Sequence, residues 1–180
     1  MIVILKEFSY VIPLFLISMI MMFLFLRIWI RERTYFTWRK LLPYIVFFLA
    51  TIGIALVTLT PQEGNDQWKN YNFIPFSNFI LHIQYNGNIF IPLRSLIANI
   101  LLFLPFGAAC CWIFIKQSRP VFLSIYFGFL LSLTIEVTQF YLPLGRSIDI
   151  DDLTMNTLGS LIGGIIVLLI AKHIEKETES

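Results

Sequence analysis

Long apolar runs, each of about 20 residues, limit the folds open to this chain. At about 1.5 Å per residue, a helix of that length crosses the roughly 30 Å hydrocarbon layer of a bilayer. The chain has 58% hydrophobic and 13% charged residues, which is more apolar surface than a water-soluble domain could bury. The sequence therefore predicts an all-α integral membrane bundle, a single domain over residues 1–180, with five spans at Phe8–Leu26, Leu41–Leu59, Leu96–Ile115, Val121–Leu142 and Leu153–Ala171.

Basic residues are distributed unequally between the connections. Of the 13 lysines and arginines, nine lie on one side of the predicted topology and four on the other. The basic loop after the first run contributes most of the nine, and Lys172 and Lys176 near the C-terminus lie on the same side. By the positive-inside rule, we expect a multi-pass protein of the bacterial plasma membrane with its N-terminus outside and its C-terminus in the cytoplasm.

The segment from Thr60 to Ser95 is then expected to face outward. Thr60-Pro61 stops a helix, and Asn86-Gly87-Asn88 is a strong turn signal between two apolar stretches. Neither stretch is long enough to span a bilayer, so the segment is predicted to lie at the outer interface or to dip in as a re-entrant piece.

Polar residues gather near the outward ends of the spans. Ser132, Glu136 and Gln139 have the i, i+4, i+7 spacing that places them on one helix face. Asp149, Asp152 and Asn156 follow a similar spacing at the start of the last span, whereas that periodicity turns Asp151 away.

Two asparagines are expected at the same depth. Asn99 lies one turn inside the outer end of the third span, and Asn72 comes from the outer segment. A charge on Glu136 inside a membrane is costly, which favours a ligand-facing pocket.

Structural roles could also explain these residues. Polar side chains near helix ends often join helices, and Asp149 and Asp152 could cap the last span. Arg146 or Arg94 could pair with Glu136. The motif "GSLIG", from Gly159 to Gly163, predicts close helix packing.

Most catalytic and metal-binding motifs are missing from the sequence; the aspartates could hold a magnesium ion at a phosphate, but two or three carboxylates are a weak signal for such a site. The acidic run at residues 149–152 lacks the glycine and final glutamate of a calcium loop, and no paired zinc histidines or Gly-x-Ser-x-Gly motif occurs. We therefore expect no metal and no cofactor, and catalytic residues are unknown.

Four stretches resemble the VanZ-like membrane protein family in their order and spacing: "NFIPF", "NILLFLPFG", "IEVTQ" and "GRSIDIDDLTMNTLG", within residues 72–163. The resemblance implies that the characteristic polar positions of the family fall here on Asn72, Asn99, Glu136, Gln139, Arg146, Asp149, Asp152 and Asn156. The family's namesake is associated with resistance to teicoplanin, a glycopeptide that binds peptidoglycan precursors outside the membrane.

Two hypotheses follow for function. One is a non-enzymatic envelope protein that binds a lipid-linked or peptidoglycan-related ligand, such as a cell-wall precursor, with membrane lipids as further partners and no nucleic acid. The other is an intramembrane hydrolase or transferase acting on a lipid head group, with Glu136 or Asp152 as the general base.

Overall fold

The computed structural model describes residues 38–61, 71–141, 144 and 148–179. The predicted first span, Phe8–Leu26, and most of the basic loop after it lie outside these residues. Arg146 lies outside them as well.

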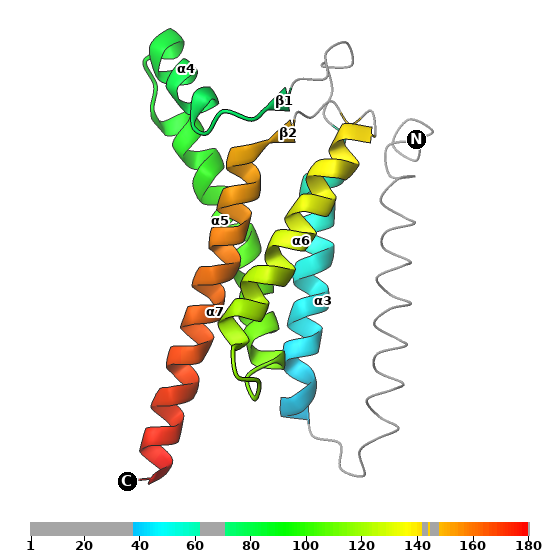
Figure 1. Cartoon of the computed structure of the whole chain (residues 1–180), viewed down its shortest axis with the longest axis vertical. Coiled ribbons are helices and arrows are strands. Elements are labelled where there is room, and N and C mark those ends of the chain that lie inside the picture. Colours follow the sequence, from blue (N-terminus) through cyan, green and yellow to red (C-terminus); the bar gives the residue numbers. More distant parts are fainter. Residues whose placement is uncertain (1–37, 62–70, 142–143, 145–147, 180) are drawn as a thin grey trace.

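Within the described residues, four long helices form the bundle, and each is long and apolar enough to cross a membrane. They are α3 (Trp38–Leu59), α5 (Phe90–Ile113), α6 (Pro120–Tyr141) and α7 (Ile150–Glu179). They run side by side along the long axis of the molecule (Figure 1). The predicted all-α membrane bundle is confirmed, with one short helix, α4 (Ser77–Asn86), beside the long ones.

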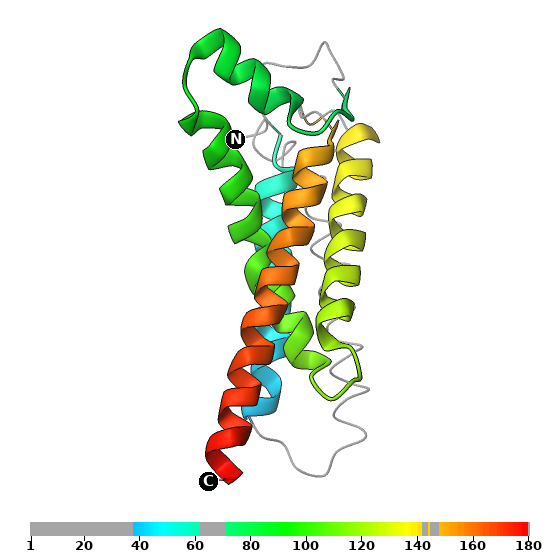
Figure 2. The same cartoon turned by 60° about the vertical axis from the view of Figure 1, so that its left-hand side comes forward.

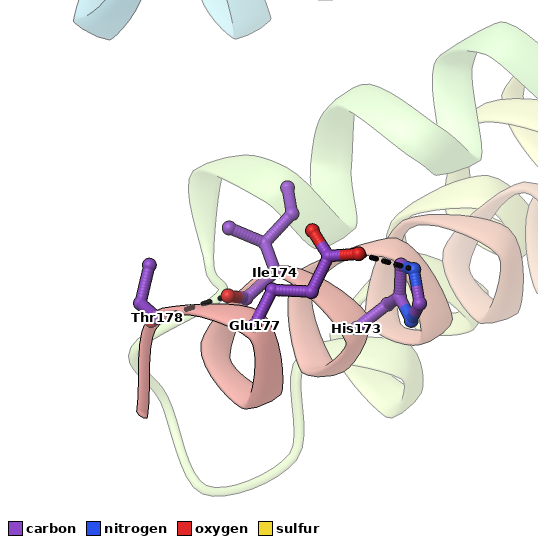
Figure 3. Close-up of polar contacts among 4 residues, drawn as sticks. All are labelled: His173, Ile174, Glu177 and Thr178. Atoms are coloured by element: carbon purple, nitrogen blue, oxygen red, sulfur yellow. Dashed lines mark hydrogen bonds and ion pairs between the residues drawn. The ribbon is translucent and has the colours of Figure 1, made fainter. Parts of the chain in front are cut away.

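α5 and α7 extend well beyond the predicted spans, and α3 begins at Trp38 instead of Leu41. α5 begins at Phe90, and Pro92 is tolerated there because it falls in the first turn, where a missing N–H breaks no hydrogen bond. α7 continues past Ala171 to Glu179, through a polar stretch. Figure 3 shows two contacts on this extension: His173 Nε2 lies 3.2 Å from Glu177, and the Thr178 hydroxyl donates to the Ile174 carbonyl. Pairs at this spacing support an exposed helix.

The two ends of the bundle differ in what they carry. At one end, called the polar end here, α3 and α6 finish and α5 and α7 begin. Two short parallel strands, β1 (Tyr71–Asn72) and β2 (Ile148–Asp149), pair there, with Asn72 opposite Asp149. The opposite end, called the tail end, carries the α5–α6 connection and the end of α7 (Figure 1).

The middle of the bundle is packed through small residues. A Cβ built on Gly159 would lie 2.3 Å from the Ile100 carbonyl oxygen, and one on Gly163 would lie 2.1 Å from that of Leu104. These contacts, with those of Gly107 and Gly128 against Ser160, define what we call the small-residue seam between α5, α6 and α7. The predicted packing role of Gly159 and Gly163 is therefore confirmed.

Candidate functional site

Asp149 is the centre of a hydrogen-bonded cluster at the polar end. It immediately precedes α7, and its Oδ1 accepts a hydrogen bond from the Asp151 backbone N–H at 3.0 Å. This is the geometry of an N-cap, which satisfies one of the four N–H groups that a helix leaves unpaired at its start. The same oxygen accepts from Asn72 Nδ2 at 3.2 Å, so the cap also holds β1.

Glu136 lies beneath this cap, on the last part of α6. Its side chain is only 5% exposed, and its Oε2 accepts a hydrogen bond from the Asp149 backbone N–H at 3.1 Å. The negative charges of Asp149 and Asp152 both act on its carboxylate. A carboxylate buried among other acids at the end of a membrane helix is an expensive arrangement for packing alone.

Asp152 connects the cluster to α5. Its Oδ1 accepts a hydrogen bond from Asn99 Nδ2, so the first turn of α7 is tied to the first half of α5. Both side chains are half-buried, as are Asn72 and Asp149. Two hydrogen-bonded pairs, Asn72–Asp149 and Asn99–Asp152, thus lie at the polar end together with Glu136, which accepts from the Asp149 backbone.

Asn156 lies one turn deeper on α7, between α7 and α6. Its Nδ2 donates to the Ser132 hydroxyl at 2.9 Å, and the side chain is only 3% exposed. Among the described residues its Oδ1 has no hydrogen-bond partner. A buried carbonyl oxygen without a donor costs free energy, so this acceptor is a candidate contact for a ligand or a water molecule.

Gln139 does not join the cluster, although it shares a helix face with Glu136. Its side chain turns toward α3, where Nε2 donates to the Thr58 carbonyl at 2.9 Å. Thr58 lies in the last turn of α3, whose carbonyls have no partner within the helix. We assign Gln139 to closing the end of α3.

Asp151 is turned away from Glu136, as the periodicity predicts, but it does not face solvent. It is 5% exposed, and both carboxylate oxygens lie 3.0 Å from the Phe76 backbone nitrogen, whose N–H they accept. Phe76 precedes α4 and has a left-handed backbone, with φ of 59°. Asp151 therefore fixes the start of α4, a role that helical spacing in α7 cannot reveal.

Of the two predicted cationic partners of Glu136, only Arg94 belongs to the described residues. Arg146 lies outside the described residues, and Arg94 is exposed on α5. Among the described residues, no ion pair joins Arg94 to Glu136. The hydrogen bond from the Asp149 backbone is the described contact that stabilises the Glu136 carboxylate.

The chemistry offered by this site is that of oxygen acceptors. Carboxylates of Glu136, Asp149 and Asp152 and the amide oxygen of Asn156 can all receive hydrogen bonds from hydroxyl, amide or ammonium groups. In the described part of the chain, no group of three or more His, Cys, Asp or Glu side chains is arranged to hold a metal ion.

Comparison with known families links most of the bundle to one of them. The model of the VanZ/LLP1 family matches residues 41–171, which include α5, α6, the polar cluster and most of α3 and α7. The match extends to α3, where hydrophobicity alone connected the sequence to the family. Comparisons with curated proteins and with solved structures found no match. The chain belongs to the VanZ/LLP1 family.

Proposed function

We propose that this protein is a cell-envelope protein of the bacterial plasma membrane that binds a lipid-linked or peptidoglycan-related ligand at its polar end. The polar end faces outward in this proposal, with the N-terminus outside and the C-terminus in the cytoplasm. The excess of lysine and arginine on the opposite side of the predicted topology supports this orientation.

One observation carries the proposal: three carboxylates, Glu136, Asp149 and Asp152, are collected in one cluster at the end of membrane-spanning helices. Packing between membrane helices is achieved elsewhere in this bundle by glycine and serine, at far lower cost. Intramembrane acids that are not needed for packing usually mark a site for a ligand or an ion.

The exposure of the cluster supports a ligand that arrives from the polar end. Asn72, Asn99, Asp149 and Asp152 are half-buried and form the accessible layer, whereas Glu136 and Asn156 lie below them. A head group rich in hydroxyl and amide donors, such as the sugar–peptide portion of a cell-wall precursor, matches these acceptors.

Ligand binding is tested with purified full-length protein and an isotopically labelled lipid-linked peptidoglycan precursor, followed by mass spectrometry. A retained, unmodified precursor is the expected result. A modified product would instead favour a hydrolase or transferase, and the absence of both would overturn the proposal.

The membership of the family suggests a phenotype for the same site. Expression in a susceptible Gram-positive host is expected to raise teicoplanin tolerance modestly, with little change for vancomycin. Asp152→Asn and Asn156→Ala are expected to abolish this effect while the protein still accumulates in the membrane. Because Asp151 anchors α4, the charge control is Glu175→Gln on the exposed end of α7, which should keep the tolerance.

A further inference from the structure

The segment Phe73–Ile91, called the uncharged segment here, contains no aspartate, glutamate, lysine or arginine. It comprises α4, the turns on either side of it and the first two residues of α5, and none of the four candidate spans includes α4. Its apolar side chains are nevertheless open: Phe73 is 67% exposed, Ile74 69% and Phe90 74%. An apolar surface of this extent marks a contact with a membrane or a protein.

α4 carries an apolar stripe formed by Phe79, Ile80 and Ile83, which lie within about 100° of one another around the helix. The exposed Leu81 and Tyr85 lie outside this stripe. His82 lies about 200° around the helix from Ile80, because each residue turns the chain by about 100°. A short amphipathic helix of this kind favours a position in the plane of a membrane surface.

The apolar surface of the uncharged segment continues that of a membrane-spanning helix. On α5, Leu93, Ile97 and Leu101 are exposed at four-residue intervals, 38%, 46% and 61% respectively, as expected for side chains that face lipid. The segment ends in the first turn of this same helix. Figure 2 shows α4 lying obliquely across the polar end of the bundle, above the start of α7.

Hydrogen bonds hold the uncharged segment in this position. The Asp151 carboxylate accepts the N–H of Phe76, and Asn72, which directly precedes the segment, donates to Asp149. Asn72 Oδ1 in turn accepts from the Ser77 hydroxyl at 2.6 Å, in the first turn of α4. The segment is therefore attached to the start of α7, beside the polar cluster.

We propose that the uncharged segment docks on the phospholipid leaflet at the polar end, with α4 in the head-group layer and its apolar face among the acyl chains. Lipid is the partner of this surface, because the exposed apolar side chains of the segment continue the lipid-facing side of α5. The absence of lysine and arginine means that apolar insertion, not attraction to anionic lipids, drives the docking.

This docking does not depend on the proposed ligand. Combined with the proposed function, it places the cluster of Asn72, Asp149 and Asp152 at the depth of lipid head groups. A lipid-linked ligand would then reach the site sideways from the leaflet.

Site-directed spin labelling of the full-length protein tests the docking directly. Single cysteines replace Ile80 or His82 in a background with Cys110→Ala and Cys111→Ala, and each labelled protein is placed in phosphatidylcholine vesicles. Power saturation then compares access by oxygen, which concentrates in lipid, with access by a water-soluble nickel chelate. Labels at Leu130, exposed in α6, and at Lys176, exposed at the end of α7, supply the lipid and water references.

The label at Ile80 is expected to resemble Leu130, and that at His82 to be more accessible to the chelate. Phosphatidylglycerol added to the vesicles should leave both values unchanged. If the labels at both positions are as accessible to the chelate as the label at Lys176, α4 lies in water and the proposal is overturned. Protection from both reagents would indicate a protein partner or a second copy, and equal lipid exposure at both would place α4 within the hydrocarbon; either result would also overturn it.

Discussion

The small-residue seam and the polar cluster hold the same helices together in opposite ways. In the seam, α5, α6 and α7 approach so closely that the backbone of one helix touches the glycines of another. The Ser124 hydroxyl lies 2.8 Å from the Gly107 carbonyl and 2.9 Å from that of Ser160. A single hydroxyl group on α6 therefore forms hydrogen bonds with both α5 and α7. In the cluster, acids and amides connect the helices through side chains.

The difference separates what packing requires from what it does not. Glycine and serine are sufficient to join membrane helices, as the seam shows. The cluster uses charged groups that a membrane disfavours, although the same helices are already joined a few turns away. This excess of charge is the physical reason for assigning ligand binding to the cluster.

The largest effect is expected from adding a methyl group to the seam. In Gly163→Ala, the new Cβ would lie 2.1 Å from the Leu104 oxygen and 2.7 Å from the Ala108 nitrogen. Both are backbone atoms of α5, so neither can move away without displacing the helix. We expect a loss of about 3 kcal/mol in the free energy of unfolding, measured by thermal denaturation in detergent.

Gly53→Ala is the matched control for this change, because a Cβ there meets nothing within 4 Å. Alanine in place of a helical glycine should leave the protein as stable or raise its stability by up to about 1 kcal/mol. If the Gly163→Ala variant and the original protein have the same melting temperature, the packing model of the seam is contradicted.

Loss of the cap of α7 should have the next largest effect. Asp149→Ala removes the acceptor for both the Asp151 N–H and Asn72, and is expected to cost about 2 kcal/mol of unfolding free energy. Asp149→Asn should lose much less, because asparagine caps helices as well as aspartate does. If the two variants unfold alike, the capping role is wrong.

A smaller effect is expected at Asp151. Asp151→Ala leaves the Phe76 N–H without its acceptor and should cost about 1 kcal/mol, whereas Asp151→Asn retains one accepting oxygen. Increased protease cleavage in the uncharged segment would accompany the loss. If the alanine variant has the same melting temperature and the same protease cleavage as the original protein, Asp151 does not anchor α4.

The smallest effect on stability is expected at Asn156. Asn156→Ala loses one hydrogen bond to Ser132 but also removes a buried oxygen that has no described partner. The free energy of unfolding should therefore change by no more than about 0.6 kcal/mol, while the retention of the ligand falls. A large loss of stability would mean that Asn156 serves packing, like the seam.

Within the described residues, the four long spans and the helix face shared by most polar residues could be predicted from the sequence, because the length and the period of the apolar pattern carry that information. The sequence predicts that Asn99 and Asp152 lie at the same depth in the membrane, and in the structure a hydrogen bond joins them. The role of Asp151 could not be predicted, since it depends on where the backbone of Phe76 arrives from a distant segment. The same holds for Gln139, whose partner is the carbonyl of Thr58, a backbone atom that no side-chain pattern marks.

The most direct test of the ligand site is a binding titration with the variant Glu136→Gln. Glutamine retains an oxygen that can accept the Asp149 N–H, so the fold should survive while the charge is lost. With a fluorescent lipid-linked peptidoglycan precursor, the variant is expected to melt like the original protein but to bind at least about tenfold more weakly, a change of roughly 1.4 kcal/mol. Unchanged affinity in a stably folded Glu136→Gln protein would contradict the account.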